Sequence, residues 1–71
     1  MLSGHVEVGT VGSFDDAVGL GEVVTGDGRR YPFQCIEIAD GTRTVAPGVA
    51  VAFTLAVRLG RTEAMTVTRM Q

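Results

Sequence analysis

The chain has 71 residues, enough for one small hydrophobic core and too few for two, so we expect a single domain over residues 1–71. It is 45% hydrophobic and 20% charged with a net charge of −2, which excludes a disordered segment and any general attraction to polyanions. All six basic residues are arginines, which excludes the Schiff-base and phosphate-loop chemistry of lysine.

No targeting or membrane segment is predicted. Met1 to His5 lacks a cationic stretch followed by an apolar one, and no apolar run approaches the roughly 20 residues of a membrane helix. The single cysteine, Cys35, excludes an intramolecular disulfide and fits a reducing compartment. We therefore expect a soluble, cytoplasmic protein with no membrane partner.

The first predicted strand contains Val6, Val8, Val11 and Ser13 and is bent. Val6 and Val8 alternate with other residues as the side chains of a half-buried strand do. Val11 and Ser13 continue out of phase past Gly9, which predicts a β-bulge at a corner of a barrel.

The next two strands form a predicted hairpin. Leu20 to Thr25 is the second strand, Asp27-Gly28 is a tight turn, and Arg30 to Cys35 is the third strand. Pro32 has no N–H to donate to a ladder, so it must lie on an edge strand or face away from any partner.

The second half of the chain is predicted to contain a loop and two more strands. Ala39 to Ala46 contains Asp40-Gly41 and precedes Pro47-Gly48, and such pairs are typical of loops. Gly60 predicts a turn into the last strand, Thr62 to Met70. The fourth strand alternates with period two, and the residues of its apolar face are Val49, Val51, Phe53, Leu55 and Val57.

These elements predict an all-β fold. Helical spacing of apolar residues is missing, and ten glycines are unfavourable inside helices. Five short strands leave no second sheet to pack against, and closure into a barrel is the simplest way to protect the sheet edges. We therefore predict a small five-stranded antiparallel barrel.

The segment Gly9-Thr10-Val11-Gly12-Ser13-Phe14-Asp15-Asp16-Ala17-Val18-Gly19-Leu20-Gly21-Glu22-Val23 resembles the opening of a bacterial cold-shock domain. The resemblance continues through Tyr31 to Ile38, Asp40-Gly41, Gly48 to Phe53 and Ala64 to Val67, so it covers nearly the whole chain. It implies an OB-type barrel of five strands that binds single-stranded RNA or DNA.

The binding motifs of that family are altered in this chain. The family motif Lys-Gly-Phe-Gly-Phe-Ile aligns with Val18 to Val23, and the motif Val-Phe-Val-His-Phe aligns with Tyr31 to Cys35. Other residues occupy seven ring-bearing positions of the family: Ser13, Leu20, Glu22, Pro32, Gln34, Cys35 and Thr42. Losing three stacked bases removes about 3–9 kcal/mol of binding free energy, whereas the total binding free energy of a micromolar complex is only about 8 kcal/mol. The resemblance therefore implies weak binding at most.

The first functional hypothesis is residual, weak binding of single-stranded RNA or DNA, ranked first because of the family resemblance. Phe14 keeps a ring near the altered motifs, and Arg29, Arg30 and Arg43 could contact phosphates through their guanidinium forks. The alternative is that these arginines are simply solvated at the ends of hairpins.

The second hypothesis is a protein-interaction or homo-oligomerisation module that uses the face with the replaced aromatics. Its candidate residues are Ser13, Leu20, Glu22, Pro32 and Gln34. Polar and small apolar replacements suit contact with a protein better than base stacking. The alternative for Leu20 is that it packs into the rim of the barrel.

No catalytic, metal or cofactor site is predicted. Cys35 has no second cysteine and lies far in sequence from His5, so it is predicted to be a packing residue. Asp15-Asp16 is predicted to form a turn, and no helix follows Gly19-Leu20-Gly21 to bind phosphate. We therefore expect no enzymatic activity, because no nucleophile, base and orienting group can be assembled.

Overall fold

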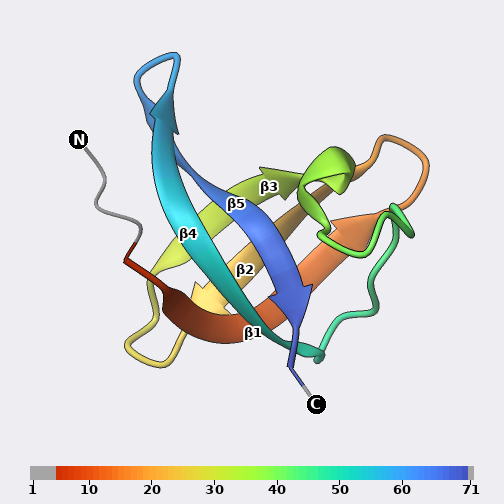
Figure 1. Ribbon diagram of the computed structural model, residues 1–71, viewed down its shortest axis with the longest axis horizontal. Helices are drawn as coiled ribbons and strands as arrows, with labels where there is room; N and C mark the ends of the chain where they lie inside the picture. Colours follow the sequence, from red (N-terminus) through yellow and green to blue (C-terminus); the bar gives the residue numbers. More distant parts are fainter. Residues whose placement is uncertain (1–4, 71) are drawn as a thin grey trace.

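The computed structural model of the chain describes residues 5–70. It confirms the all-β prediction and the antiparallel arrangement of five strands (Figure 1). The elements are β1 (Glu7–Asp15), β2 (Leu20–Thr25), β3 (Arg30–Gln34), the 3-10 helix η1 (Cys35–Glu37), β4 (Ala50–Arg58) and β5 (Arg61–Arg69). In the part of the chain that the structure describes, no helix is long and apolar enough to cross a membrane.

The five strands form one sheet in the order β3-β2-β1-β4-β5. The sheet is strongly curved, and the β4–β5 hairpin crosses in front of β2 and β3 (Figure 1). Within residues 5–70 no strand ladder joins β3 to β5, so the sheet is open where the sequence predicted closure. The segment after η1 contacts β5 instead, through a parallel bridge between Ile38 and Val67 and a 2.8 Å hydrogen bond from the Ala39 N–H to the Val67 carbonyl.

The bend in β1 comes from a β-bulge, as predicted, and the bulge lies between Val11 and Ser13, beyond Gly9. One extra residue there reverses the alternation, so Val11 is buried while Ser13 faces outward. Gly9 has a different role, because a Cβ atom at this position would lie 2.5 Å from the Val24 carbonyl oxygen. The glycine allows β1 and β2 to approach each other closely.

The third strand is one residue shorter than predicted. It ends at Gln34, and Cys35 begins η1 with its N–H donating to the Gly19 carbonyl at 2.8 Å. This contact turns the chain toward the β1–β2 turn instead of continuing β3. Pro32 lies on β3, which is an edge strand of the sheet, as its missing N–H requires.

The hydrophobic core lies on the concave side of the sheet. Its buried side chains are Val11, Val23, Phe33, Ile38, Val45, Val51, Phe53, Ala64 and Val67. The predicted apolar face of β4 is buried at Val51 and Phe53, but Val57 is 65% exposed. The tip of the β4–β5 hairpin extends beyond the other strands (Figure 1), in agreement with the exposure of Val57.

Candidate interaction surface on β1, β2 and β3

The structure brings the five candidate residues for protein contact onto one side of the sheet. Leu20 lies opposite Gln34 and Glu22 opposite Pro32 in the β2–β3 ladder, and Ser13 lies opposite Glu22 in the β1–β2 ladder. Residues directly opposite each other in antiparallel strands project to the same side. We call the surface formed by Ser13, Leu20, Glu22, Pro32 and Gln34 the altered face.

All aromatic rings of the chain lie away from the altered face. The sequence contains three phenylalanines and one tyrosine. Phe33 and Phe53 are buried, the Phe14 ring stacks on Phe33 with centroids 5.8 Å apart, and the Tyr31 ring tilts against Phe53 at 6.2 Å. The ladders place Phe14 and Phe33 opposite Gly21, and Tyr31 opposite the buried Val23, all on the core side. The altered face therefore offers no ring on which a base could stack.

Gly21 explains where the two stacked rings lie. A Cβ atom on Gly21 would be 2.7 Å from atoms of both the Phe14 and the Phe33 ring. The missing side chain leaves the space that these rings fill. Phe14, the ring that the sequence proposed for nucleic-acid binding, is thus half-buried in the packing of the domain.

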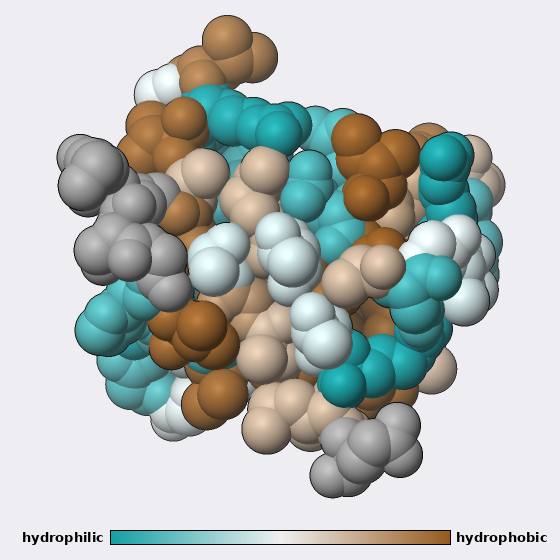
Figure 2. Space-filling model, in the orientation of Figure 1, coloured by the Kyte–Doolittle hydropathy of each residue, from teal (hydrophilic) through white to brown (hydrophobic). Residues whose placement is uncertain are grey.

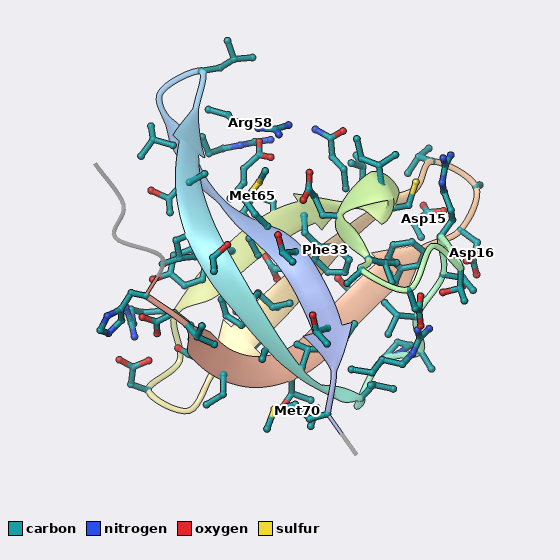
Figure 3. All side chains as sticks on the ribbon, viewed as in Figure 1. Asp15, Asp16, Phe33, Arg58, Met65 and Met70 are labelled. Atoms are coloured by element: carbon teal, nitrogen blue, oxygen red, sulfur yellow. The ribbon has the colours of Figure 1, made fainter. Side chains whose placement is uncertain are left out.

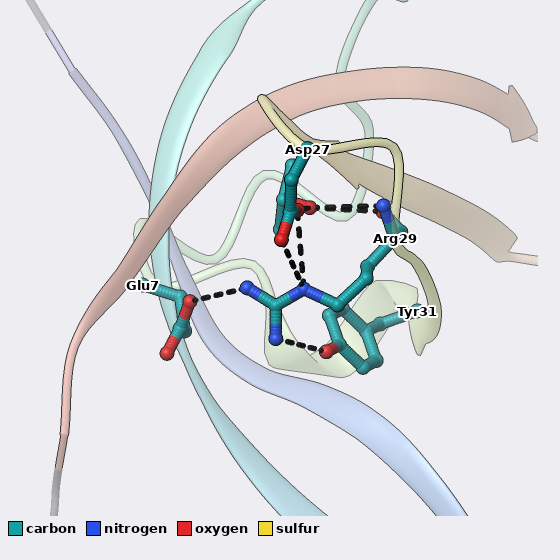
Figure 4. Close-up of polar contacts among 5 residues, drawn as sticks. Glu7, Asp27, Arg29 and Tyr31 are labelled. Carbon is teal, nitrogen blue, oxygen red and sulfur yellow. Dashed lines mark hydrogen bonds and ion pairs between the residues drawn. The ribbon is translucent and has the colours of Figure 1, made fainter.

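Arg29 is held by groups of its own hairpin and of β1 (Figure 4). Its Nε lies 2.9 Å from the Asp27 carboxylate, Nη2 lies 3.5 Å from the Glu7 carboxylate, and Nη1 donates to the Tyr31 hydroxyl at 3.0 Å. Hydrogen bonds from the Thr25 hydroxyl and from Arg29 lower the pKa of Asp27 below its ordinary value, and the bond to Asp27 raises the pKa of Arg29. A phosphate at Arg29 would have to compete with two carboxylates.

Arg30 and Arg43 differ in how their charge is compensated. The Arg30 guanidinium lies 2.9 Å from the Glu22 carboxylate of the altered face. Arg43 is exposed in the loop before β4, in the left-handed region with φ of 64°, and among residues 5–70 no acidic side chain forms an ion pair with it. Only one of the three arginines proposed for phosphate contact is therefore without a paired carboxylate in the described chain.

Apolar side chains gather at one end of the altered face. Val18, Leu20 and Ile36 are each more than half exposed. The hydrogen bond from Cys35 to Gly19 holds the β1–β2 turn against η1, so the three residues lie next to this backbone contact in sequence. Leu20 is 52% exposed, so it does not pack into the rim. Sequence reasoning missed Ile36, because it placed no helical turn after β3.

The remaining candidates have structural roles. Cys35 is half-buried and packs against the core, as predicted. Asp15 and Asp16 lie at the end of β1, where Asp15 accepts a hydrogen bond from the Ala17 N–H at 2.9 Å and Asp16 accepts one from the Thr44 hydroxyl (Figure 3). This arrangement confirms the turn. Among the residues that the structure describes, no three histidine, cysteine or acidic side chains converge as metal ligands.

The outer surface of β4 and β5 differs from the altered face. It is pale to light brown in the space-filling view, which indicates weakly polar and small apolar residues (Figure 2). A groove on this surface is lined by Val6, Ala52, Phe53, Thr54, Thr66 and Thr68. It contains no charged group that would select a ligand.

Comparison with known proteins gives no assignment: no protein-family model matches the chain, and no curated protein matches it. The cold-shock resemblance stays a prediction.

Proposed function

We propose that the chain is a protein-binding module on a cold-shock-type OB barrel and that it binds through the altered face. The barrel is supported by the glycine and apolar spacing of the sequence and by the curved five-stranded antiparallel sheet. The bridge between Ile38 and Val67, which ties the segment after η1 to β5, supports it as well. The single thiol of Cys35 supports a cytoplasmic location.

The position of the aromatic rings carries this proposal. A platform for single-stranded nucleic acid relies on exposed rings, each contributing roughly 1–3 kcal/mol per stacked base. All four rings of this chain pack on the core side, and the altered face has leucine, proline and polar residues in their place. An exposed surface of this composition suits another protein better than bases.

The experiment compares capture of proteins by three immobilised forms of the domain. Leu20→Asp introduces a charge at the apolar end of the altered face, at a position already half exposed. Val57→Asp is the matched control, because Val57 is also apolar and more than half exposed but lies on the β4–β5 hairpin. We expect partners to bind the wild type and Val57→Asp and to be lost with Leu20→Asp. Capture that is the same for all three forms would contradict the proposal.

A second candidate function is weak binding of single-stranded nucleic acid at the loop before β4. The exposed Arg43 favours it, because its guanidinium has no carboxylate partner among the described residues. In an NMR titration with a short oligothymidine at low salt, we expect shifts over residues 40–46 that disappear in Arg43→Gln. One phosphate contact predicts a log–log salt slope of about −0.7. An unchanged spectrum at low salt would rule this candidate out.

A further inference from the structure

Two opposite charges lie side by side on the exposed side of β2 and β3. The carboxylate of Glu22 and the guanidinium of Arg30 are 2.9 Å apart, and the two side chains are 38% and 62% exposed. Exposed pairs of this kind contribute little to the stability of a single chain. Either group can therefore exchange its partner at small cost.

Exposed apolar residues lie on β2 near the charged pair and at the end of that strand. Leu20 is two residues before Glu22 on β2 and projects to the same side of the sheet, with Val18 and Ile36 at the same end. Apolar side chains that are this exposed in neighbouring positions mark contact surfaces.

The edge of the sheet restricts how a partner can approach. Pro32 lies on the edge strand β3, opposite Glu22, and has no N–H for another strand to pair with. Addition of a strand along this edge is therefore unfavourable. A partner has to contact the altered face through side chains.

We propose that the partner is a second copy of this chain, in a symmetric dimer formed through the altered face; this inference rests on the proposed function. Two-fold symmetry places a surface against itself, and with the axis beside this pair Arg30 of one copy faces Glu22 of the other, twice in each dimer. A partner with charge of one sign only would meet a like charge at one of the two residues. A stable interface covers about 800 Å² on each partner, roughly a fifth of the 4407 Å² surface of this chain, so one face suffices.

Reversing the charges of Glu22 and Arg30 and measuring the oligomeric state by sedimentation equilibrium tests the dimer. We expect the wild type to dimerise reversibly, and Glu22→Arg or Arg30→Glu each to weaken the dimer about tenfold or more, because like charges then face each other. The double variant Glu22→Arg/Arg30→Glu restores the dimer, and an equimolar mixture of the two single variants forms a mixed dimer. Both single variants lose the same Glu22–Arg30 pair within one chain, so their folding stability should change to a similar extent. Thermal unfolding of both variants measures that stability. Arg61→Glu, on the β4–β5 hairpin, leaves the dimer unchanged.

Two results would overturn the dimer. One is a wild type that stays monomeric up to millimolar concentration, and the other is a dimer that neither single exchange weakens. The test of the proposed function is separate. If the wild type is monomeric but Leu20→Asp abolishes capture of other proteins, the chain is still a protein-binding module, with a different partner. If Leu20→Asp changes neither capture nor self-association, both proposals fall.

Discussion

Gly21 is the residue whose small size the packing of the aromatic rings requires. We expect Gly21→Ala to lower the free energy of unfolding by about 1–3 kcal/mol, because the added Cβ would overlap the Phe14 and Phe33 rings at 2.7 Å. Urea unfolding measures the change. Gly26→Ala is the control, since a Cβ there has nothing within 4 Å and its φ is not left-handed. Equal effects of the two substitutions would show that the rings move aside freely.

Asp27 makes the stability of the β2–β3 hairpin depend on pH. Hydrogen bonds from Thr25 and Arg29 lower its pKa in the folded chain below the ordinary value of 3.8. Because the folded pKa is the lower one, the stabilisation is complete above the unfolded pKa and is lost as the pH falls through the folded pKa. We expect Asp27→Asn to be less stable than the wild type at neutral pH, with a difference that narrows below about pH 4. Thermal unfolding from pH 7 to pH 2 measures this, and a difference independent of pH would contradict it.

Leu59 occupies a position in the β4–β5 turn whose backbone conformation is unfavourable for leucine. Leu59 and Gly60 have φ of 52° and 78°, and two positive values in a two-residue hairpin indicate a type I′ turn, in which Asn-Gly is preferred. The Leu59 side chain is fully exposed and gains nothing from packing. We expect Leu59→Asn to raise the free energy of unfolding by about 0.5–1 kcal/mol and Leu59→Val to lower it. Urea unfolding of both variants checks the two signs.

At the scale of elements, the loop between η1 and β4 is held by one side chain of β5. Arg69 pairs with the Asp40 carboxylate and donates to the Thr44 carbonyl at 2.6 Å and to the Thr42 hydroxyl at 3.3 Å. We expect Arg69→Gln to speed amide hydrogen exchange over residues 40–46 while exchange in β1 and β2 stays unchanged, because the variant loses the charge-assisted contacts to the loop. Arg61→Gln is the control and leaves the loop as it is. Unchanged loop exchange in Arg69→Gln would show that other contacts hold the loop.

The strands themselves were predicted well from local patterns. The alternation of apolar residues predicted β4, and the Asp27-Gly28 pair predicted the turn between β2 and β3. Both predictions succeeded because side-chain alternation and turn conformation depend on residues close in sequence. The end of β3 was less predictable, since the contact between Cys35 and Gly19 that terminates it joins residues 16 positions apart. The exposure of Val57 likewise depends on where the other strands end.

At the scale of the whole molecule, Ile38 connects the segment after η1 with the last strand, β5. It is buried and bridges to Val67 on β5, although no ladder connects β3 with β5 in the described residues. We expect Ile38→Ala to lower the free energy of unfolding by about 2–4 kcal/mol and to accelerate exchange of the Ala39 amide, which bonds to the Val67 carbonyl. Ile36→Ala is the matched control, because Ile36 is more than half exposed and its truncation changes stability little. Similar losses in both variants would contradict a bridging role.

The sequence by itself determined the all-β class, the five strands and the restriction of Pro32 to an edge strand or to a position facing away from any partner. These features follow from local alternation, from turn chemistry and from the residue types themselves. Only the tertiary structure decided which side chains meet. It paired Arg29 with Asp27 and Arg30 with Glu22, and it packed every ring on the core side. Charge compensation and ring burial depend on which strands are neighbours in the sheet and on their register. Local sequence patterns do not specify these pairings, because strands that are neighbours in the sheet can be far apart in sequence.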